Sequence, residues 1–486
     1  MRISNKRWIL VVLVSVLSSA CGEPASGPSG ALAPSFATAD RASGKYIVTF
    51  SGERVPVHFA DDVRALGGVI DLSHDGAGLA LVSELSDDAA TELVKSKGVS
   101  DVLRDAIVRP SADDDLGDRA DADATDVSTE SHGSPTAAAF YARQWNMRAI
   151  RADAAWSAGY FGSADVTVGI LDTGIDYLHP DLSGHVDLSR SISLVPAEDA
   201  LLATLYPGRH PISDLRGHGT AVASIIVSNG HVIAGVTKNT TLFGVKVHNR
   251  FRQGVLSDYL RGILYAADNG ADIINMSIGG QLVSPFTGGN MSKRDNPSIV
   301  AAVQRAINYA NHRGVVIVVS GGNDAVDLDH DGDNFRVFCG SVHVTCVSST
   351  APTAAAGVNG PWTDQDLLAF TSNFGRSGIH VAAPGGNAPA QRPFTGIWNL
   401  CTTTPTSASP AVCQTGDQVF QSSGTSWSAA HTSGLAALLV ERIEKGRPAQ
   451  IGAAIEQSAD DLGQAGTDPH YGKGRINVAR ALGIVP

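Results

Sequence analysis

The chain has 486 residues, of which 43% are hydrophobic and 17% charged, so length and composition indicate a globular protein with a large buried core. The formal net charge of −12 gives no electrostatic support for a nucleic-acid partner, and we expect none. The 52 glycines exceed the usual share and indicate many tight turns around a packed scaffold.

The N-terminus has the pattern of an export signal. Basic residues precede an apolar run over residues 8–17 that is too short to span a bilayer, and small residues then lead to Cys21. We therefore expect a signal peptide over residues 1–20 and a tether over residues 21–43. Cys21 stands where bacterial lipoproteins carry an acylated cysteine, although the small residues before it also suit ordinary signal peptidase. The protein is expected to be secreted or held at the bacterial cell envelope, with a lipid anchor as its only membrane contact.

The next segment has the pattern of a small α+β domain over residues 44–110. Apolar periodicity predicts strands at 45–50, 77–82 and 102–108 and helices at 57–66 and 87–97. This domain is near the lower size limit for independent folding. The acidic segment that follows, 111–138, has almost no large apolar residues, and we expect it to be a linker.

From residue 139 onward, apolar strand patterns alternate with helical ones. Strands are predicted at 166–171, 242–247, 272–276 and 315–319, and apolar residues at helical spacing occupy 260–267 and 300–310. Such strand-helix-strand units imply an α/β fold with a mostly parallel sheet and helices on both faces. Functional sites in these folds lie at the carboxyl ends of the strands.

The cysteines support an oxidising compartment. Besides Cys21 there are four, and pairing within each neighbouring couple would give Cys339–Cys346 and Cys401–Cys413. Four cysteines allow three connectivities, so this local pairing is a preference and the alternatives stay open.

Three segments carry residues suited to nucleophilic catalysis. Asp172 ends a buried strand, His218 lies between glycines at the start of an apolar helix, and Ser426 opens a helix that runs to about residue 440. Singly, each has an ordinary structural explanation as a turn aspartate, a solvated histidine or a helix cap. Together they form a set in which Asp172 orients His218, and the other nitrogen of His218 takes the proton of Ser426.

The order of these segments resembles the subtilase family of serine peptidases. The shared blocks are Asp172-Thr-Gly-Ile-Asp176, Gly217-His-Gly-Thr220 and Gly424-Thr-Ser426, and the similarity runs from about residue 144 to the C-terminus. It implies a subtilisin-like three-layer α/β/α domain over residues 139–486 that cleaves protein or peptide substrates through an acyl-enzyme. It also implies that the domain at 44–110 is a ferredoxin-like inhibitory propeptide, so that the protein is a self-processing zymogen. We expect a monomer that requires no cofactor for its chemistry.

The same resemblance assigns further site residues. Asn323 matches the asparagine that stabilises the oxyanion, with the backbone amide of Ser426 as second donor. The substrate-binding positions are Ser277, Ile278, Gly279, Gly321 and Gly322. Asp324 lies near the rim of this pocket, where its charge would favour basic side chains. The sequence departs from the family at two positions, with Trp427 in place of the usual methionine and Ala430 in place of proline.

Two loops near these residues carry further expectations. Alternating carboxylates resemble the start of a calcium loop, with an acidic surface turn as the alternative: Asp327, Asp329, Asp331 and Asp333. Phe338 stands where an EF-hand needs an acidic residue, so an EF-hand is excluded. The stretch 386–421 is longer than the family requires, and we expect it to form a surface loop close to the site.

Two other interpretations explain fewer of these residues. In an α/β-hydrolase the base follows the serine, so Ser426 would use His431 or His470, and the Asp172 and His218 segments would be unexplained. An inactive surface protein on a peptidase scaffold is disfavoured because the complete triad and Asn323 are present.

Overall fold

The central sheet is built from the apolar runs that the sequence marks as buried strands. The computed structural model describes residues 44–111 and 133–485, except 285, 286, 288, 295, 337 and 389. The sheet has the order β16-β13-β12-β10-β6-β8-β7, with β17 also paired to β13. All its pairings are parallel except that between β13 and β16. Its strands are β6 (Thr167–Asp172), β7 (Ile192–Ser193), β8 (Thr241–Lys246), β10 (Ile273–Met276), β12 (Val316–Ser320), β13 (Val344–Ala351), β16 (Leu367–Leu368) and β17 (Val381–Pro384).

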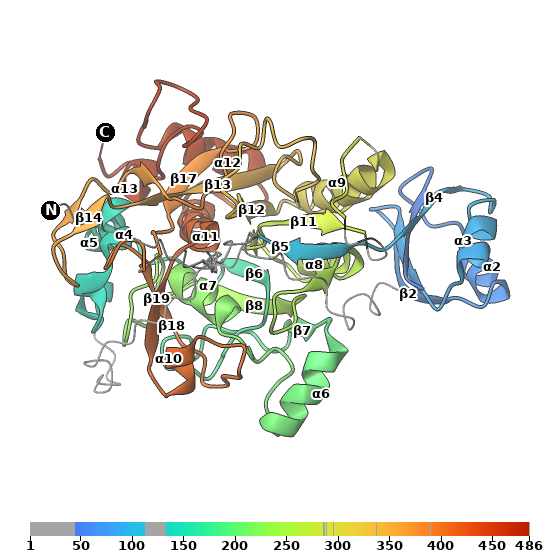
Figure 1. Cartoon of the computed structure of the whole chain (residues 1–486), viewed down its shortest axis with the longest axis horizontal. Helices are drawn as coiled ribbons and strands as arrows, with labels where there is room; N and C mark the ends of the chain where they lie inside the picture. The colour runs from blue at the N-terminus through green and yellow to red at the C-terminus, as the bar shows by residue number, and fades with distance from the viewer. Residues whose placement is uncertain are drawn as a thin grey trace, which may run out of the picture. The chain divides into compact units, whose positions relative to one another are not determined.

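Helices cover both faces of this sheet, as β12 illustrates. Val316 and Val318 join the hydrophobic core under α7 (His218–Ile226), α11 (Thr425–Ile443) and α12 (Pro448–Gln457). Ile317 and Val319 point to the opposite face and join the core under α8 (Leu256–Asp268) and α9 (Pro297–His312). Figure 1 shows α11 and α8 on opposite sides of the strands. The predicted three-layer α/β/α architecture with a mostly parallel sheet is therefore confirmed.

Shorter elements complete this part of the chain. The other helices are η1 (Pro135–Ala137), η2 (Tyr141–Arg143), α4 (Trp145–Ala149), α5 (Ala152–Ser157), α6 (Pro196–Leu205), α10 (Ala411–Gln414) and α13 (Val478–Ala481). The other strands are β9 (Gly254–Val255), β11 (Gly280–Val283), β14 (Ala354–Ala355), β15 (Trp362–Thr363), β18 (Ile397–Leu400) and β19 (Val419–Ser422). Among the described residues, no helix combines the length and the apolar character needed to cross a membrane.

The N-terminal domain has the βαββαβ order of a ferredoxin-like fold. Its antiparallel sheet has the strand order β2-β3-β1-β4. The elements are β1 (Tyr46–Phe50), α2 (Phe59–Ala65), β2 (Val69–His74), β3 (Leu79–Ser83), α3 (Asp87–Leu93) and β4 (Val99–Arg104). The sequence prediction found all of these except β2, whose residues alternate between exposed and partly buried up to His74.

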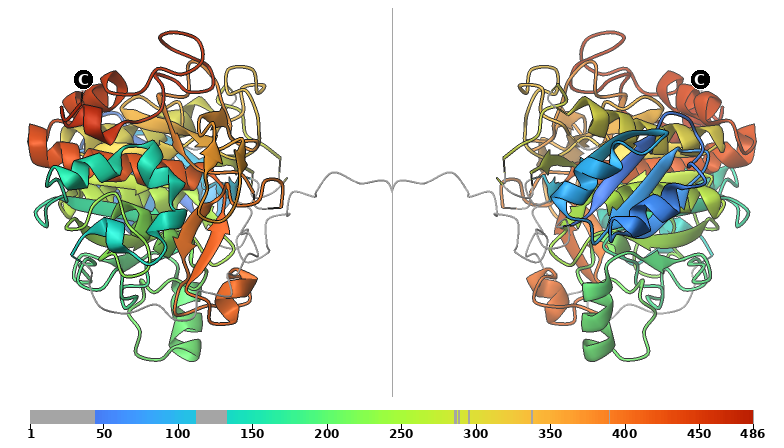
Figure 2. Two further views of the ribbon diagram at one scale, coloured as in Figure 1. Left: turned by 90° about the vertical axis from the view of Figure 1, so that its left-hand side faces the viewer. Right: turned by 90° about the vertical axis from the view of Figure 1, so that its right-hand side faces the viewer.

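Both faces of this small sheet are covered. Tyr46 and Val48 of β1 pack into the domain's own core with α2 and α3, whereas Ile47 joins the core that contains α8 and α9. On the second face, Arg305 of α9 donates to the carbonyl of Phe50 at 2.8 Å. The right-hand view of Figure 2 shows this domain in blue. The apolar side chains on the second face of this sheet, Ile47, Leu79 and Leu81, are therefore buried in the core that contains α8 and α9.

The C-terminal strand of this domain, β5 (Ile107–Pro110), joins a different sheet. The sequence predicted one strand over 102–108, but β4 ends at Arg104, and β5 begins at Ile107 and lies between β11 and β9. Both pairings are antiparallel, with Pro110 opposite Gly280. Beyond the strand, the amide of Ser111 donates to the carbonyl of Gly279 at 2.8 Å. This domain thus reaches the residues that the sequence assigned to substrate binding.

The stretch 386–421 is not the surface loop that we expected. It contains β18 and most of β19, which pair antiparallel, and the side chains of Trp398 and Phe420 are buried in the main core. The structure joins Cys401 to Cys413 and Cys339 to Cys346, with Cα–Cα distances of 5.3 and 5.4 Å. Both distances are typical of disulfides, and these are the two pairs that the sequence favoured.

The predicted signal peptide, tether and Cys21 lie outside the described residues, as does most of the expected linker. At its two ends, that linker is shorter than we expected. Ser111 is buried against Gly279, and residues 135–137 form η1. The remaining prediction for residues 112–132 stays a prediction.

Candidate active site

Asp172 and His218 meet at the carboxyl end of β6. The Nδ1 atom of His218 lies 2.7 Å from Oδ1 of Asp172, and the amide of Thr173 donates to the same oxygen at 2.7 Å. His218 is the first residue of α7, and Gly219 permits close packing there because a Cβ would overlap the carbonyl of Gly174. The His218 side chain is fully buried, so it is not the solvated histidine of the ordinary structural explanation.

The electrostatic setting keeps the Asp172 carboxyl ionised. Burial raises its pKa, but the charge of His218 and the hydrogen bond to its ring outweigh burial, so the net pKa lies below the ordinary value. A buried carboxylate beside a ring nitrogen fixes the tautomer of that ring, with the proton on Nδ1 and the lone pair on Nε2.

Ser426 lies in the first turn of α11, next to Trp427, whose ring contacts that of His218. Its Oγ lies 3.3 Å from the carbonyl oxygen of Ser277, and the Ser277 hydroxyl donates to the Ser426 carbonyl at 2.9 Å. The next residue, Trp427, is fully buried, and its ring centroid lies 5.2 Å from that of His218. The tryptophan that replaces the usual methionine therefore packs on the imidazole.

Asn323 lies beside this serine, and Thr425 fixes its orientation. Its Oδ1 accepts hydrogen bonds from the Thr425 amide at 2.9 Å and the Thr425 hydroxyl at 2.8 Å. Because the amide oxygen faces Thr425, the NH₂ end of Asn323 points the other way. A fixed donor of this kind can stabilise developing negative charge on a substrate oxygen.

The residues assigned to substrate binding come together after β10 and β12. A Cβ on Gly279 would lie 2.5 Å from Cα of Gly322, so the two segments approach closely. Gly321 donates to the carbonyl of Val347 at 2.9 Å, which ties its loop to β13. Ser277, Ile278 and Gly279 lead directly from β10 into β11, the strand that pairs with β5.

A second buried carboxylate, Asp214, was missed in the sequence. Oδ1 accepts from the Thr173 hydroxyl at 2.9 Å and from the Gly217 amide at 2.9 Å, and Oδ2 accepts from the Thr220 amide at 2.9 Å. Asp214 therefore ties the residue after Asp172 to the turn before His218. The sequence could have indicated this role, because Asp214 stands just before a helix start. Aspartate at such a position accepts hydrogen bonds from the backbone amides of the first helical turn.

Replacing Asp214 with asparagine is expected to misplace the Asp172–His218 pair. The new NH₂ group would face donors, and we expect a loss of about 2–4 kcal/mol of stability from the broken hydrogen bonds. Below the melting temperature, kcat should fall by about tenfold to hundredfold while KM changes little. Steady-state kinetics and thermal unfolding measure both effects.

The matched control is Asp181→Asn. Asp181 is also fully buried, and it accepts only backbone amides, from His231, Val232 and Ile233, among the hydrogen bonds found in the described residues. This variant should lose stability but keep kcat. Equal losses of kcat in the two variants would show that Asp214 has no specific role in positioning.

The four carboxylates of the expected calcium loop do not converge. Asp327 contacts His330 at 2.8 Å, Asp329 accepts from the Arg376 amide at 2.7 Å, and Asp331 pairs with Arg336 at 2.8 Å. Asp333 accepts a hydrogen bond from the backbone amide of Arg294 at 2.9 Å. Within the described ranges, no group of three or more His, Cys, Asp or Glu is arranged to hold a metal ion. The geometry of this loop therefore gives the calcium prediction no support.

His431, the base that an α/β-hydrolase would need, is occupied elsewhere. Its Nδ1 lies 2.7 Å from the carbonyl oxygen of Trp427, and its Nε2 lies 2.8 Å from Nδ2 of Asn146. Burial lowers the pKa of His431 to about 4, so the ring is neutral near pH 7. His431 therefore acts as a structural residue of the α11 core.

Comparisons with known proteins agree with this geometry. The model of the subtilase family matches residues 163–474. Thermitase of Thermoactinomyces vulgaris is 30% identical over 348 residues, which cover 71% of this chain and 97% of thermitase. An alkaline protease of Alkalihalobacillus alcalophilus is 27% identical over 457 residues, covering 91% of this chain and 92% of that protein.

Solved structures agree on the fold. The epidermin leader peptide processing serine protease from Staphylococcus aureus superposes with a TM-score of 0.65 at 21% identity. The match covers 90% of this chain and 98% of that chain. Fervidolysin from Fervidobacterium pennivorans, described as a keratinolytic enzyme related to subtilisin, matches with a TM-score of 0.62 at 21% identity, over 91% of this chain and 61% of fervidolysin.

Proposed function

This chain belongs to the subtilase family of serine endopeptidases, and on that premise we propose that Asp172, His218 and Ser426 cleave its substrates as a catalytic triad. The observation that carries the proposal is the 2.7 Å contact between His218 and Asp172 beside the start of α11, where Ser426 lies. The pKa of Asp172 is lowered, so the carboxylate stays ionised and can stabilise the imidazolium that forms during the reaction.

The proposed reaction runs in two halves. Ser426 Oγ attacks the carbonyl carbon of the scissile bond while its proton passes to Nε2 of His218. The resulting oxyanion accepts hydrogen bonds from Asn323 and from the backbone amide of Ser426. His218 then protonates the leaving amine, which leaves an acyl group on Ser426. Water, deprotonated by His218, hydrolyses this ester and restores the enzyme.

Hydrolysis of casein tests this function. The purified protein should degrade casein, and a serine-directed inhibitor should abolish the activity, whereas a metal chelator should leave the chemistry intact. Failure to cleave casein and a panel of unfolded proteins would contradict the proposed endopeptidase activity.

We further propose that the domain at 44–110 is an inhibitory propeptide that the enzyme removes from itself. Two observations support this: β5 pairs with β11 next to the substrate-binding residues, and Arg305 binds the carbonyl of Phe50 on β1. An extended segment that pairs with exposed strands of its partner, as β5 pairs with β11 and β9, is a common mode of peptide binding. Intact-mass measurements should detect cleavage between residues 111 and 139. They also test the proposed export route, because they would identify an acyl group on Cys21 or a free N-terminus after the signal peptide.

We expect the stability of the precursor to depend on pH through Asp105, which links the N-terminal domain to α8. Its carboxylate is fully buried and accepts from the Ser257 amide at 3.0 Å, at the start of α8. Burial raises the pKa of Asp105 to about 6, and the nearby charge of Asp258 also raises it. Because the folded-state pKa exceeds the unfolded value of 3.8, its contribution to stability is fully present below pH 3.8 and is lost as pH rises through about 6.

The uncleaved Ser426→Ala precursor allows this to be measured. Its melting temperature should be compared with that of the Ser426→Ala/Asp105→Asn double variant between pH 4 and pH 7.5. The advantage of the aspartate form should shrink as pH rises. An advantage that is constant or grows with pH would contradict the assigned role of Asp105.

A further inference from the structure

The end of β5 places one side chain in a small polar subsite. Ser111 is only 4% exposed, and its hydroxyl donates to Oδ2 of Asp324 at 3.2 Å. A Cβ built on Gly322 would lie 2.8 Å from Ser111 Oγ, and one built on Gly279 would lie 3.1 Å from it. The hydroxyl therefore occupies space that exists because both positions are glycine. We define the Ser111 subsite by the residues that form it: Gly279, Gly322, Asp324, Asn373 and Arg336.

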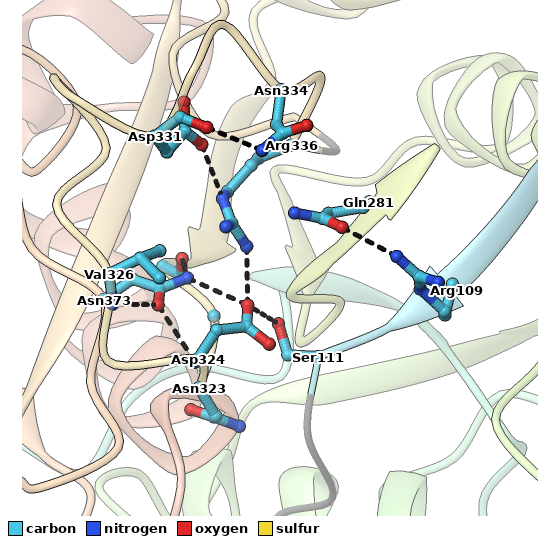
Figure 3. Close-up of polar contacts among 12 residues, drawn as sticks. Arg109, Ser111, Gln281, Asn323, Asp324, Val326, Asp331, Asn334, Arg336 and Asn373 are labelled. Carbon is cyan, nitrogen blue, oxygen red and sulfur yellow. Dashed lines mark hydrogen bonds and ion pairs between the residues drawn. The ribbon is translucent and has the colours of Figure 1, made fainter. Parts of the chain in front are cut away.

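The Asp324 carboxylate of this subsite forms an ion pair with the buried side chain of Arg336. Arg336 is 7% exposed in its side chain and lies between two carboxylates, with Nη1 at 2.5 Å from Asp324 and Nε at 2.8 Å from Asp331. Figure 3 shows Arg336 and Ser111 both directed at the Asp324 carboxylate, where both contact Oδ2. The guanidinium fixes the direction of the Asp324 acceptor and compensates its charge.

The side-chain amide of Asn373 fixes the backbone of the loop that carries Asp324. Oδ1 of Asn373 accepts from the amides of Asp324 at 2.9 Å and Val326 at 3.1 Å. Its Nδ2 donates to the carbonyl of Gly321 at 3.0 Å and approaches Oδ2 of Asp324 at 3.4 Å. Asp324 therefore has a defined backbone and side-chain position, as a residue that discriminates between substrates requires.

The register of β5 places this subsite along the path of a substrate. Pro110 lies opposite Gly280, and the Ser111 amide bonds to the Gly279 carbonyl. A peptide that continued this register by two residues would lie opposite Ser277, whose carbonyl contacts Ser426 Oγ. The residue in the Ser111 subsite is thus close to the bond to be cut.

We propose that the Ser111 subsite selects substrates with a serine at this position, and that the Asp324–Arg336 pair is the determinant of this preference. The inference rests on the proposed endopeptidase function and adds a substrate class to it. Alanine fits the space but leaves Asp324 without its hydroxyl donor, and larger side chains collide with the two glycine segments. A lysine gains little because Arg336 already compensates Asp324, contrary to our expectation that Asp324 favours basic residues.

Internally quenched peptides that span residues 105–120 test this in the mature enzyme. With serine at position 111 as reference, alanine should lower kcat/KM by about tenfold, the effect of losing a hydrogen bond to a charged group. Valine and lysine should lower it by about a hundredfold, because a crowded site excludes added bulk. The cleaved bond is located by mass spectrometry.

The Asp324→Ala enzyme tests whether the Asp324 carboxylate causes the preference for serine. It should lower the serine-to-alanine ratio of kcat/KM at position 111 from about ten to about one, because the acceptor is gone. The arginine-to-alanine ratio at position 109 should not change, since Arg109 donates instead to Gln281 at 2.9 Å. Asp333→Ala, which removes a carboxylate outside the subsite, is the matched control and should keep both ratios. In Arg336→Gln, the lysine peptide should gain relative to serine.

The outcomes separate this inference from the function on which it rests. Two results would reject the proposed serine preference and leave the endopeptidase function standing. In the first, casein is cleaved but the peptide is not. In the second, the wild-type enzyme has the same kcat/KM for all peptides that differ at position 111. If neither casein nor peptide is cleaved, the endopeptidase function itself fails. The wild-type series decides the question even if Asp324→Ala or Arg336→Gln does not fold.

Discussion

Replacing Ser426 with alanine should lower kcat by about 10⁶-fold, the magnitude known for loss of the triad serine in subtilisin, a member of the same family. The variant has no nucleophile, so the acyl-enzyme cannot form. The chain should therefore stay uncleaved between residues 111 and 139, as intact-mass measurement would detect. Because alanine is a good helix former, α11 should keep its geometry.

The neighbouring serine provides the control for this prediction. Ser428 is also buried in α11, and its hydroxyl donates to the carbonyl of Ala383 at 3.0 Å. Ser428→Ala should keep its activity and its self-processing. A Ser426→Ala protein that still releases its N-terminal domain and cleaves casein would eliminate the proposed nucleophile.

Replacing Asp172 with asparagine should lower kcat by about 10⁴-fold, the magnitude measured for the equivalent change in a chymotrypsin-fold protease. An amide can donate to Nδ1 of His218, which would place the ring proton on Nε2. That nitrogen could then no longer accept the proton of Ser426. KM should change little, because Asp172 is buried away from the substrate.

The pH profile distinguishes this effect from simple unfolding. The pKa of Asp172 lies below its ordinary value, so its ionised form stabilises the fold above about pH 4 and this contribution is lost as pH falls further. Asp172→Asn should therefore melt at a lower temperature than wild type at pH 7 and approach it in strong acid. Wild-type kcat in the asparagine variant at pH 7 would contradict the assigned role.

The buried parallel strands were the most predictable part of the fold. Continuous apolar runs identify β6, β10 and β12, because strands covered by helices on both faces have no polar side. β2 was missed because its exposed side carries polar residues and it depends on β3 for pairing. The pairing of β18 with β19 could not be predicted, because the two strands are far apart in sequence and β18 packs against α7, an element much earlier in the chain.

The site could be predicted to the extent that its residues stand in recognisable local blocks. Asp172 ends a strand, and His218 and Ser426 lie at the start of helices, so their settings and order identified them. Asn323 lies in the loop after β12, and only the family resemblance assigned it a role. Asp214 lies in a turn, and its role depends on contacts with Thr173 and Thr220 that only the folded chain brings together.

The charge balance of the substrate pocket could not be predicted either, because the ion pair between Asp324 and Arg336 forms only in the folded chain. Asp324 and Arg336 are separated by an irregular loop with no periodicity, so nothing in the sequence pairs them. The structure places them 2.5 Å apart, and the Ser111 hydroxyl contacts the same carboxylate oxygen of Asp324. Likewise, the end of the N-terminal domain could be recognised as a strand, but its partners β9 and β11 could not.

If His218 and Asp172 activate Ser426 as a nucleophile, covalent labelling of the mature protein with a serine-directed fluorophosphonate, followed by peptide mapping, tests this most directly. We expect one labelled peptide, modified at Ser426, and almost no labelling in His218→Ala. Labelling at another serine, or equal labelling of Ser426 in the His218→Ala protein, would contradict it.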